Sequence, residues 1–187
     1  MILAFDLNHD EDQRQILNAV SAALSASYPI QRLRGDARDK LGSIASLGVF
    51  ALGSSHDQGG GGFTLVEEAL VHTLLGRHLI STRALATAIA AALARDPDQR
   101  PLSNDFAGGG AEACAAIPAG DDMLLVDAGD AAFAVLFGDR RIDLLDISDI
   151  ERKPEEGLGH SVPVARAKRR HSKVVVGTGL AHLLGIA

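Results

Sequence analysis

Apolar residues recur every three or four positions along the first half of the chain. The first such stripe predicts a helix that stops before Pro29, and it consists of Ile16, Leu17, Val20 and Leu24. Three further stripes predict helices from about residue 36 to 48, 64 to 76 and 82 to 94. The first half of the chain is therefore expected to be a bundle of helices.

Residues that start and stop helices flank these stripes. Asn8 with Glu11, and Thr64 with Glu67, have the spacing of a capping box, in which the two side chains bond to free backbone amides. Gly48 stands where a left-handed residue is expected after a helix end. Both kinds of signal support the predicted helix boundaries.

The fourth predicted helix is rich in alanine. It is expected to follow a cap at Ser81 or Thr82 and to run between Ala84 and Ala94. Alanine favours helix and lets neighbouring helices approach closely. Residues 98–110 are polar and then glycine-rich, a composition that predicts a linker.

The pattern changes from helical to strand-like after residue 110. Short apolar runs between Gly, Pro and Asp turns predict strands at residues 112–117, 123–126, 131–137, 141–147 and 161–169. Gly138-Asp139 favours a tight hairpin, and the whole series predicts an antiparallel meander. The expected fold is α+β, with an α-helical N-terminal bundle at residues 1–107 and a small antiparallel β domain at 108–176.

The last stretch, residues 177–187, is expected to begin a further helical domain. After Gly177-Thr178-Gly179 comes an apolar stripe formed by Leu180, Leu183, Leu184 and Ala187. Such a helix stops after about two turns, and isolated helices shorter than ~12–15 residues are marginal in water. The sequence therefore predicts a truncated C-terminal domain, with an apolar stripe that favours self-association.

Composition and charge narrow the class of protein. The chain has 187 residues, 47% hydrophobic and 22% charged, as in ordinary globular proteins. Its net charge of −6 gives no general attraction for nucleic acid or an anionic membrane, and no apolar run approaches the ~20 residues of a membrane span. No secretory signal is recognisable, and Cys114 is the single cysteine. We expect no nucleic-acid partner, no membrane span and a cytoplasmic location.

The glycine-rich loop from Gly59 to Gly62 is the first candidate for chemistry. A P-loop needs Lys and then Ser or Thr after its last glycine, but Phe63-Thr64 follow here. No G-x-G-x-x-G register fits, and no strand leads into the loop. A tight structural loop is the favoured interpretation. The histidines and the lone cysteine lack metal-ligand spacing, so no metal site is predicted.

A basic run near the end contrasts with the acidic chain. Its members are Arg166, Lys168, Arg169, Arg170 and Lys173. Charge on an exposed strand edge protects it from pairing with another chain. Alternatively, the run contacts the phosphates of a nucleotide or of CoA. The first interpretation is favoured, because side chains on a strand alternate between two faces.

Four short features occur in order between about Asp6 and Ala94. They are Leu47-Gly48, Gly59-Gly60-x-Gly62, Glu67 and Leu75-Gly76-Arg77. In this order and spacing they resemble the N-terminal helical domain of the FAD-dependent acyl-CoA dehydrogenase family. The second half of the chain resembles a shortened middle β domain of that family. The C-terminal helical domain, with the catalytic glutamate, would lie beyond residue 187.

The resemblance implies a function and a set of site residues. It implies FAD as cofactor and an acyl-CoA as substrate, desaturated between Cα and Cβ by the complete enzyme, while this chain alone would be inactive. It implies no catalytic residue here and identifies no cofactor-binding residue. The family's acyl channel is lined by the helix after Leu-Gly-Arg, which implies Leu85, Ala88 and Ile89 as substrate-binding residues. A homo- or hetero-oligomer is also implied.

Two alternatives stay open at this point. The chain could be a non-catalytic partner subunit that lends a wall to an active dehydrogenase. It could instead be a helical binding module of unrelated function.

Overall fold

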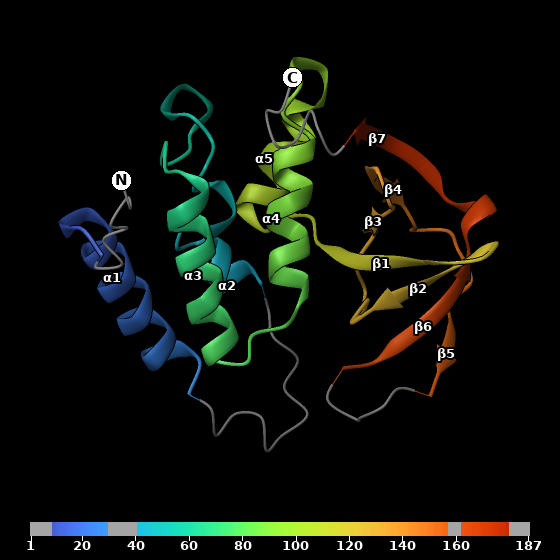
Figure 1. The fold of residues 1–187 in the computed structure, drawn as a ribbon, viewed down its shortest axis with the longest axis horizontal. Helices are drawn as coiled ribbons and strands as arrows, with labels where there is room; N and C mark the ends of the chain where they lie inside the picture. Colours follow the sequence, from blue (N-terminus) through green and yellow to red (C-terminus); the bar gives the residue numbers. More distant parts are fainter. Residues whose placement is uncertain (1–8, 30–40, 157–161, 180–187) are drawn as a thin grey trace, which may run out of the picture.

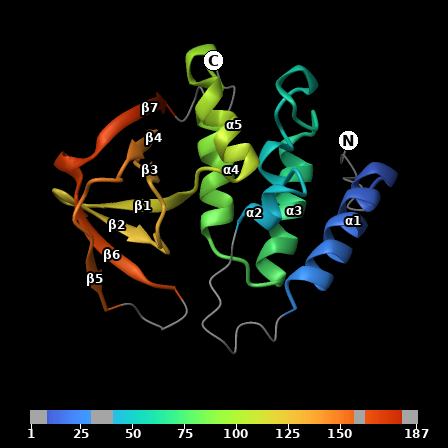
Figure 2. The same ribbon diagram turned by 180° about the vertical axis from the view of Figure 1, so that it is seen from behind.

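The computed structural model describes residues 9–29, 41–156 and 162–179. The helices precede the strands along the chain, and the two form separate layers (Figure 1). The view from behind shows the same arrangement (Figure 2). The predicted α+β architecture is confirmed.

The helical part contains five α-helices and three 3₁₀ turns among the described residues. The α-helices are α1 (Glu11–Ser27), α2 (Gly42–Ala45), α3 (Leu65–Arg77), α4 (Arg83–Leu93) and α5 (Arg100–Gly108). The 3₁₀ turns are η2 (Val49–Ala51), η3 (His56–Gln58) and η4 (Pro97–Gln99). The prediction of a linker at residues 98–110 is therefore wrong. Pro101 stands in the first turn of α5, where proline is tolerated, and Gly109 ends the helix at φ 74°.

The capping predictions have different outcomes. Thr64 and Glu67 form the predicted capping box at the start of α3. At α1 the box is made instead by Asp10 and Gln13, because the helix begins at Glu11. Asn8 lies outside the described residues, as does Asp36, the expected cap of the second helix. Asp10, two positions after Asn8, takes the capping role, and its side-chain oxygen accepts a hydrogen bond from the amide of Gln13.

Seven strands of the described part of the chain form one sheet. They are β1 (Ala113–Ala119), β2 (Asp122–Val126), β3 (Phe133–Phe137), β4 (Arg141–Asp146), β5 (Lys153–Glu155), β6 (Val164–Lys168) and β7 (Lys173–Gly179). Their order is β5-β6-β2-β1-β3-β4-β7. The hairpin predicted at Gly138-Asp139 joins β3 to β4, and the Gly138 amide donates to the carbonyl of Arg141. Strands β5 and β7 were not among the predicted ones.

The predicted meander needs one correction. β1 and β3 pair in parallel, while the other neighbours in the sheet are antiparallel. The cause is the chain path, since β2 takes one side of β1 and the chain then crosses to pair β3 on the other side. The sheet is thus mixed. β7 also extends through Gly179, so the first residues of the expected C-terminal helical domain are strand, and the rest of that stretch lies outside the described residues.

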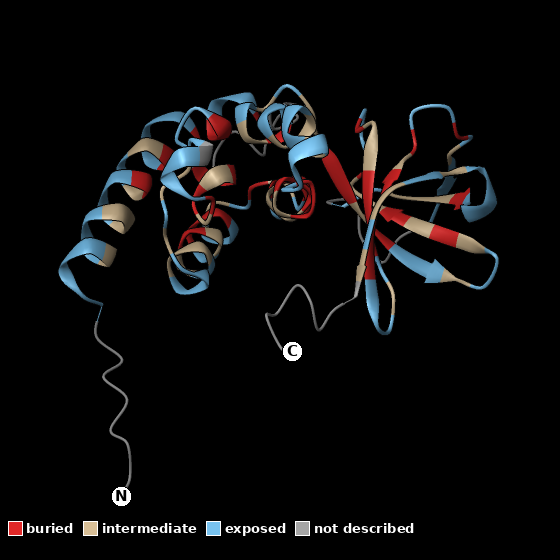
Figure 3. Cartoon of the chain, turned by 90° about the horizontal axis from the view of Figure 1, so that it is seen from above, coloured by how far each residue is buried: buried red, intermediate tan, exposed pale blue. Residues whose placement is uncertain are grey.

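Buried apolar residues in the described ranges fall into three groups. One lies among the helices and includes Leu24, Leu41 and Val71. A second lies between α4, α5 and one face of the sheet, where Phe106 meets Phe133 edge-on with ring centroids 5.2 Å apart. A third group lies on the opposite face of the sheet. Seen from above, buried positions continue from the helices into the neighbouring strands (Figure 3).

Candidate functional site

The glycine-rich loop is held by its own backbone. The amides of Gly59, Gly60, Gly61 and Gly62 donate to the carbonyls of His56, Ser55, Ala51 and Ser54, respectively. None of these four donors is left to cradle a phosphate. Gly60 also has no room for a side chain, because a Cβ there would lie 2.2 Å from the carbonyl oxygen of Ser54. The contacts support the predicted structural role of the loop.

Helix α4 is fixed against the sheet by polar contacts on its buried side. The hydroxyl of Thr87 accepts a hydrogen bond from the Ala113 amide at 3.0 Å, and Thr87 is fully buried. Arg83, also buried, forms an ion pair with Glu112. The Ser81 hydroxyl accepts from the Arg83 amide at 3.2 Å and donates to Asp127 at 2.5 Å. These contacts connect the start of α4 to the first two strands.

Another side of α4 is partly exposed to solvent. Leu85, Ala88, Ile89 and Ala92 are spaced i, i+3, i+4 and i+7, so they share one face of the helix. Leu85 is 50% exposed, and the other three are partly exposed. We call these four residues the open face of α4. The structure thus brings the three predicted substrate-binding residues together on an apolar surface that the described residues cover only in part, since Ala88 and Ile89 also pack against neighbouring core residues.

A second apolar surface lies on the part of the sheet beyond the helices. Ile117, Leu124 and Arg166 are neighbours across β1, β2 and β6, on the same sheet face as Ala113, which packs under α4. Ile117 is 50% exposed and Leu124 partly so. The helices therefore cover only part of this sheet face.

The composition of this sheet surface bears on flavin binding. Strands β1 and β2 read ACAAIPA and DMLLV, so neither carries a hydroxyl or amide side chain that could bond to a flavin ring. The apolar side chains could only pack against it. The described residues of these strands therefore do not build a flavin site by themselves.

The titratable groups of the described chain show no catalytic pairing. Hydrogen bonds from Thr64 and Gln13 lower the pKa of Glu67 to about 2, which matches a capping role. Burial raises the pKa of the Cys114 thiol to about 12, so that the thiol is unreactive at neutral pH. Within the described residues, no three His, Cys, Asp or Glu side chains are grouped to hold a metal ion.

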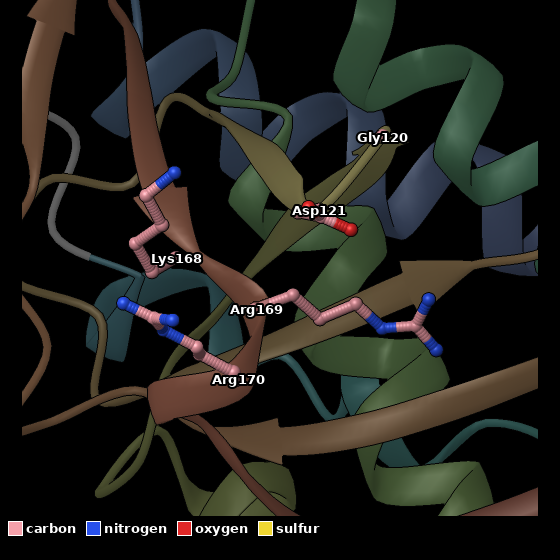
Figure 4. Close-up of a pocket in the computed structure, with 5 residues that line it drawn as sticks. All are labelled: Gly120, Asp121, Lys168, Arg169 and Arg170. Atoms are coloured by element: carbon pink, nitrogen blue, oxygen red, sulfur yellow. The ribbon is translucent and has the colours of Figure 1, made fainter.

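The basic run forms a corner at one end of the sheet, where it borders a cavity of about 580 Å³ (Figure 4). The lining includes Gly120 and Asp121, from the turn between β1 and β2, with Lys168, Arg169 and Arg170. In Figure 4 the Arg169 side chain extends away from those of Lys168 and Arg170. We call Lys168, Arg169 and Arg170 the basic corner.

Edge protection does not explain the basic corner. β6 lies between β5 and β2, inside the sheet, so its charges do not guard an edge. Two of them have cross-strand partners instead: Arg166 bonds to Glu155 at 2.5 Å, and Lys168 lies 2.6 Å from Asp122. The hydrogen bond from Lys168 is the main cause that lowers the pKa of Asp122. Only Lys173 of the run lies on an edge strand, β7.

No helix within the described ranges is long and apolar enough to cross a membrane. No family model and no curated protein matches the chain. Among solved structures, the chain is similar to a "Tcur3481-Tcur3483 steroid ACAD G363A variant", with a TM-score of 0.67, 19% identity, and coverage of 94% of this chain and 59% of that one. It is also similar to the ChsE4–ChsE5 complex from Mycobacterium tuberculosis, with a TM-score of 0.69, 17% identity, and coverage of 97% and 61%.

A third similar structure is the butyryl-CoA dehydrogenase of Megasphaera elsdenii, with a TM-score of 0.58, 13% identity, and coverage of 93% of this chain and 58% of that one. The described helices and sheet therefore have the acyl-CoA dehydrogenase fold, as the sequence motifs predicted. This chain spans about three fifths of the length of each of these three structures.

Proposed function

We propose that this chain contributes an acyl-binding wall to an FAD-dependent acyl-CoA dehydrogenase. The observation that supports this most is the open face of α4, where Leu85, Ala88 and Ile89 form an apolar surface. A fatty-acyl chain gains affinity by removing such a surface from water, at about 25 cal/mol per Å². Small side chains at positions 88 and 92 leave room for the chain beside the helix.

The chemistry of the reaction is assigned to residues outside the described part. FAD supplies the hydride acceptor when it is bound. β1 and β2 offer apolar contact and no hydroxyl or amide side chain to it, and the carboxylate of Asp122 is paired with Lys168, so further polar contacts must come from elsewhere. The described residues bind and orient the acyl chain and exclude water from one side of it. On this proposal the 187-residue chain alone is colourless and inactive.

A partner subunit is the second candidate. Two of the similar structures are named as pairs, ChsE4–ChsE5 and Tcur3481–Tcur3483, and a hetero-oligomer would bring together a wall from one chain and a flavin site from another. The absence of hydroxyl and amide side chains from β1 and β2 favours this arrangement. Copurification distinguishes the candidates: stoichiometric FAD with the complete product of this gene alone supports the enzyme, while FAD that arrives only with a second chain supports the partner. We place the protein in the cytoplasm in either case.

The acyl-binding proposal is tested by narrowing the open face. Ala88→Phe in the complete enzyme or complex should raise KM for long or bulky acyl-CoAs about tenfold, and for short ones much less, because the ring occupies the space of the distal acyl carbons. Ala69→Phe makes the same change at an exposed position of α3 and should leave both KM values unchanged. Equal effects on the KM of short and long substrates, together with lowered stability, would show that Ala88 has a purely structural role.

A further inference from the structure

A small cavity lies between the glycine-rich loop and α5. Its volume is about 290 Å³, at the lower end of the ~300–1,000 Å³ of ligand pockets. The residues that line it include Ser54 and Gly59 from the loop region, Arg95 after α4, and Arg100, Ser103 and Asn104 of α5. The position is built from three separate segments, so its shape depends on the folded chain.

The cavity carries positive charge without an ion-pair partner. Arg95 and Arg100 are exposed, and within the described ranges neither lies in an ion pair. Two acidic residues near these arginines, Asp57 and Glu68, are not part of the lining. Asp57 is attracted to Arg100, though its pKa is lowered mainly by a hydrogen bond from Ser55. Glu68 and Arg95 both border Gly53. Two guanidinium groups without lining carboxylates favour an anionic ligand.

Ser54 adds a buried polar group to the same wall. Ser54 is 9% exposed and lies in the cavity lining. The hydroxyl of Ser103 is already used, donating to the Ala91 carbonyl at 2.9 Å. An anion in the cavity would give Ser54 an acceptor for its proton.

We propose that this cavity binds the phosphate group of a small phosphorylated compound. A phosphate monoester carries a charge of about −1.5 to −2 at neutral pH, which matches the two arginines. Guanidinium groups bind phosphate through paired N–H donors, and the Ser54 hydroxyl adds a third contact. The loop contributes shape only, because its four glycine amides are bonded internally. The volume of about 290 Å³ leaves room for a phosphate group and a short organic part.

The test is isothermal titration calorimetry of the intact chain with glycerol 3-phosphate and with inorganic phosphate. Arg95→Gln and Arg100→Gln should each weaken binding about tenfold, as expected for the loss of a charge-assisted hydrogen bond. Ser54→Ala keeps the Cβ and should weaken binding severalfold. Arg77→Gln removes the same charge from an exposed position of α3 and should change the affinity less than twofold. Circular dichroism confirms that each variant is folded.

The outcomes separate the sources of the phosphate group. Tighter binding of glycerol 3-phosphate assigns the cavity to a phosphorylated metabolite, and equal binding of inorganic phosphate assigns it to the free ion. Absence of binding overturns the proposal. So does a tenfold loss in Arg170→Gln with no loss in Arg100→Gln, because that result places the anion at the basic corner.

Discussion

Two sides of α4 differ in how far they are buried. The side that carries Arg83, Thr87 and Ala90 is buried against the sheet and α5, with its polar groups paired. The side that carries Leu85 and Ile89 is equally apolar and remains partly exposed. Both sides consist mainly of small aliphatic residues, so hydropathy alone does not separate them.

The difference lies in what each side is paired with. Burial on the first side is accompanied by hydrogen bonds to specific backbone groups, and these fix the helix in one register. The open face has no such partner among the described residues and is free to meet another apolar surface. A contiguous apolar patch that a protein leaves uncovered marks a binding surface. Substitutions on the two sides should therefore affect different properties.

The largest effect is expected from Phe106, on the side of α5 that meets the sheet. Phe106→Ala removes a fully buried ring and its edge-on contact with Phe133, and should lower the free energy of unfolding by about 3–5 kcal/mol. Urea denaturation gives this value. Phe137→Ala is the control, because Phe137 is 38% exposed and should cost much less. Equal costs would contradict a core between α5 and the sheet.

Thr87 tests the polar part of the same interface. Thr87→Val keeps the shape but leaves the Ala113 amide without its acceptor, and should cost about 1–3 kcal/mol in urea denaturation. Thr73→Val is the matched change on an exposed part of α3, where the hydroxyl donates to the Ala69 carbonyl and water can replace the bond. Its cost should stay below about 0.5 kcal/mol. A neutral Thr87→Val would mean that another group satisfies Ala113.

Glu67 gives a pH-dependent contribution far from both sides of α4. Its pKa is lowered from 4.5 to about 2, so its stabilising effect is fully present above pH 4.5 and is lost as the pH falls toward 2. Glu67→Gln should cost about 1 kcal/mol at pH 7, the size of a helix cap, since the group is partly exposed to water. The difference from the unchanged protein should vanish near pH 2. Glu156→Gln, at an exposed position, should show no such trend.

The smallest effect on stability is expected on the open face of α4. Leu85→Ser should change the free energy of unfolding by less than about 0.5 kcal/mol, because the side chain is half-exposed. The same change should weaken the binding of long acyl-CoAs by the complete protein. A large loss of stability would show that Leu85 belongs to the core, and the two sides of α4 would then not differ.

The sequence predicted the elements whose patterns are local. Thr64 and Glu67 mark the start of α3, Gly76 lies one residue before its end, and the β3–β4 hairpin follows from Gly138. Helix α5 was missed because its polar residues and Pro101 resemble a linker, although Leu102 and Phe106 are four apart on one face. β5 is short and fully exposed, so it carries no alternation of buried and exposed positions.

Features that depend on distant residues were beyond local patterns. The parallel pairing of β1 with β3 depends on the chain crossing past β1 after β2, and nothing within either strand encodes it. The Arg83–Glu112 ion pair joins residues 29 positions apart. The open face of α4 was predicted only through a family resemblance. Its spacing, Leu85-x-x-Ala88-Ile89, is equally typical of a buried stripe, and only the arrangement of neighbouring elements decides between them.

One measurement tests the open face as an acyl-binding surface most directly. The native thiol of Cys114 is buried, with its pKa raised to about 12, so within these 187 residues a single introduced cysteine is the reactive one. Ala88→Cys places a thiol on the open face, and Ala69→Cys places one on the exposed side of α3 as a control. The rate of maleimide labelling of the complete protein is then followed with acyl-CoAs of increasing chain length. Our account predicts that longer acyl chains slow labelling at position 88 progressively and leave position 69 unchanged. Equal labelling rates at position 88 with and without a long acyl-CoA would contradict it.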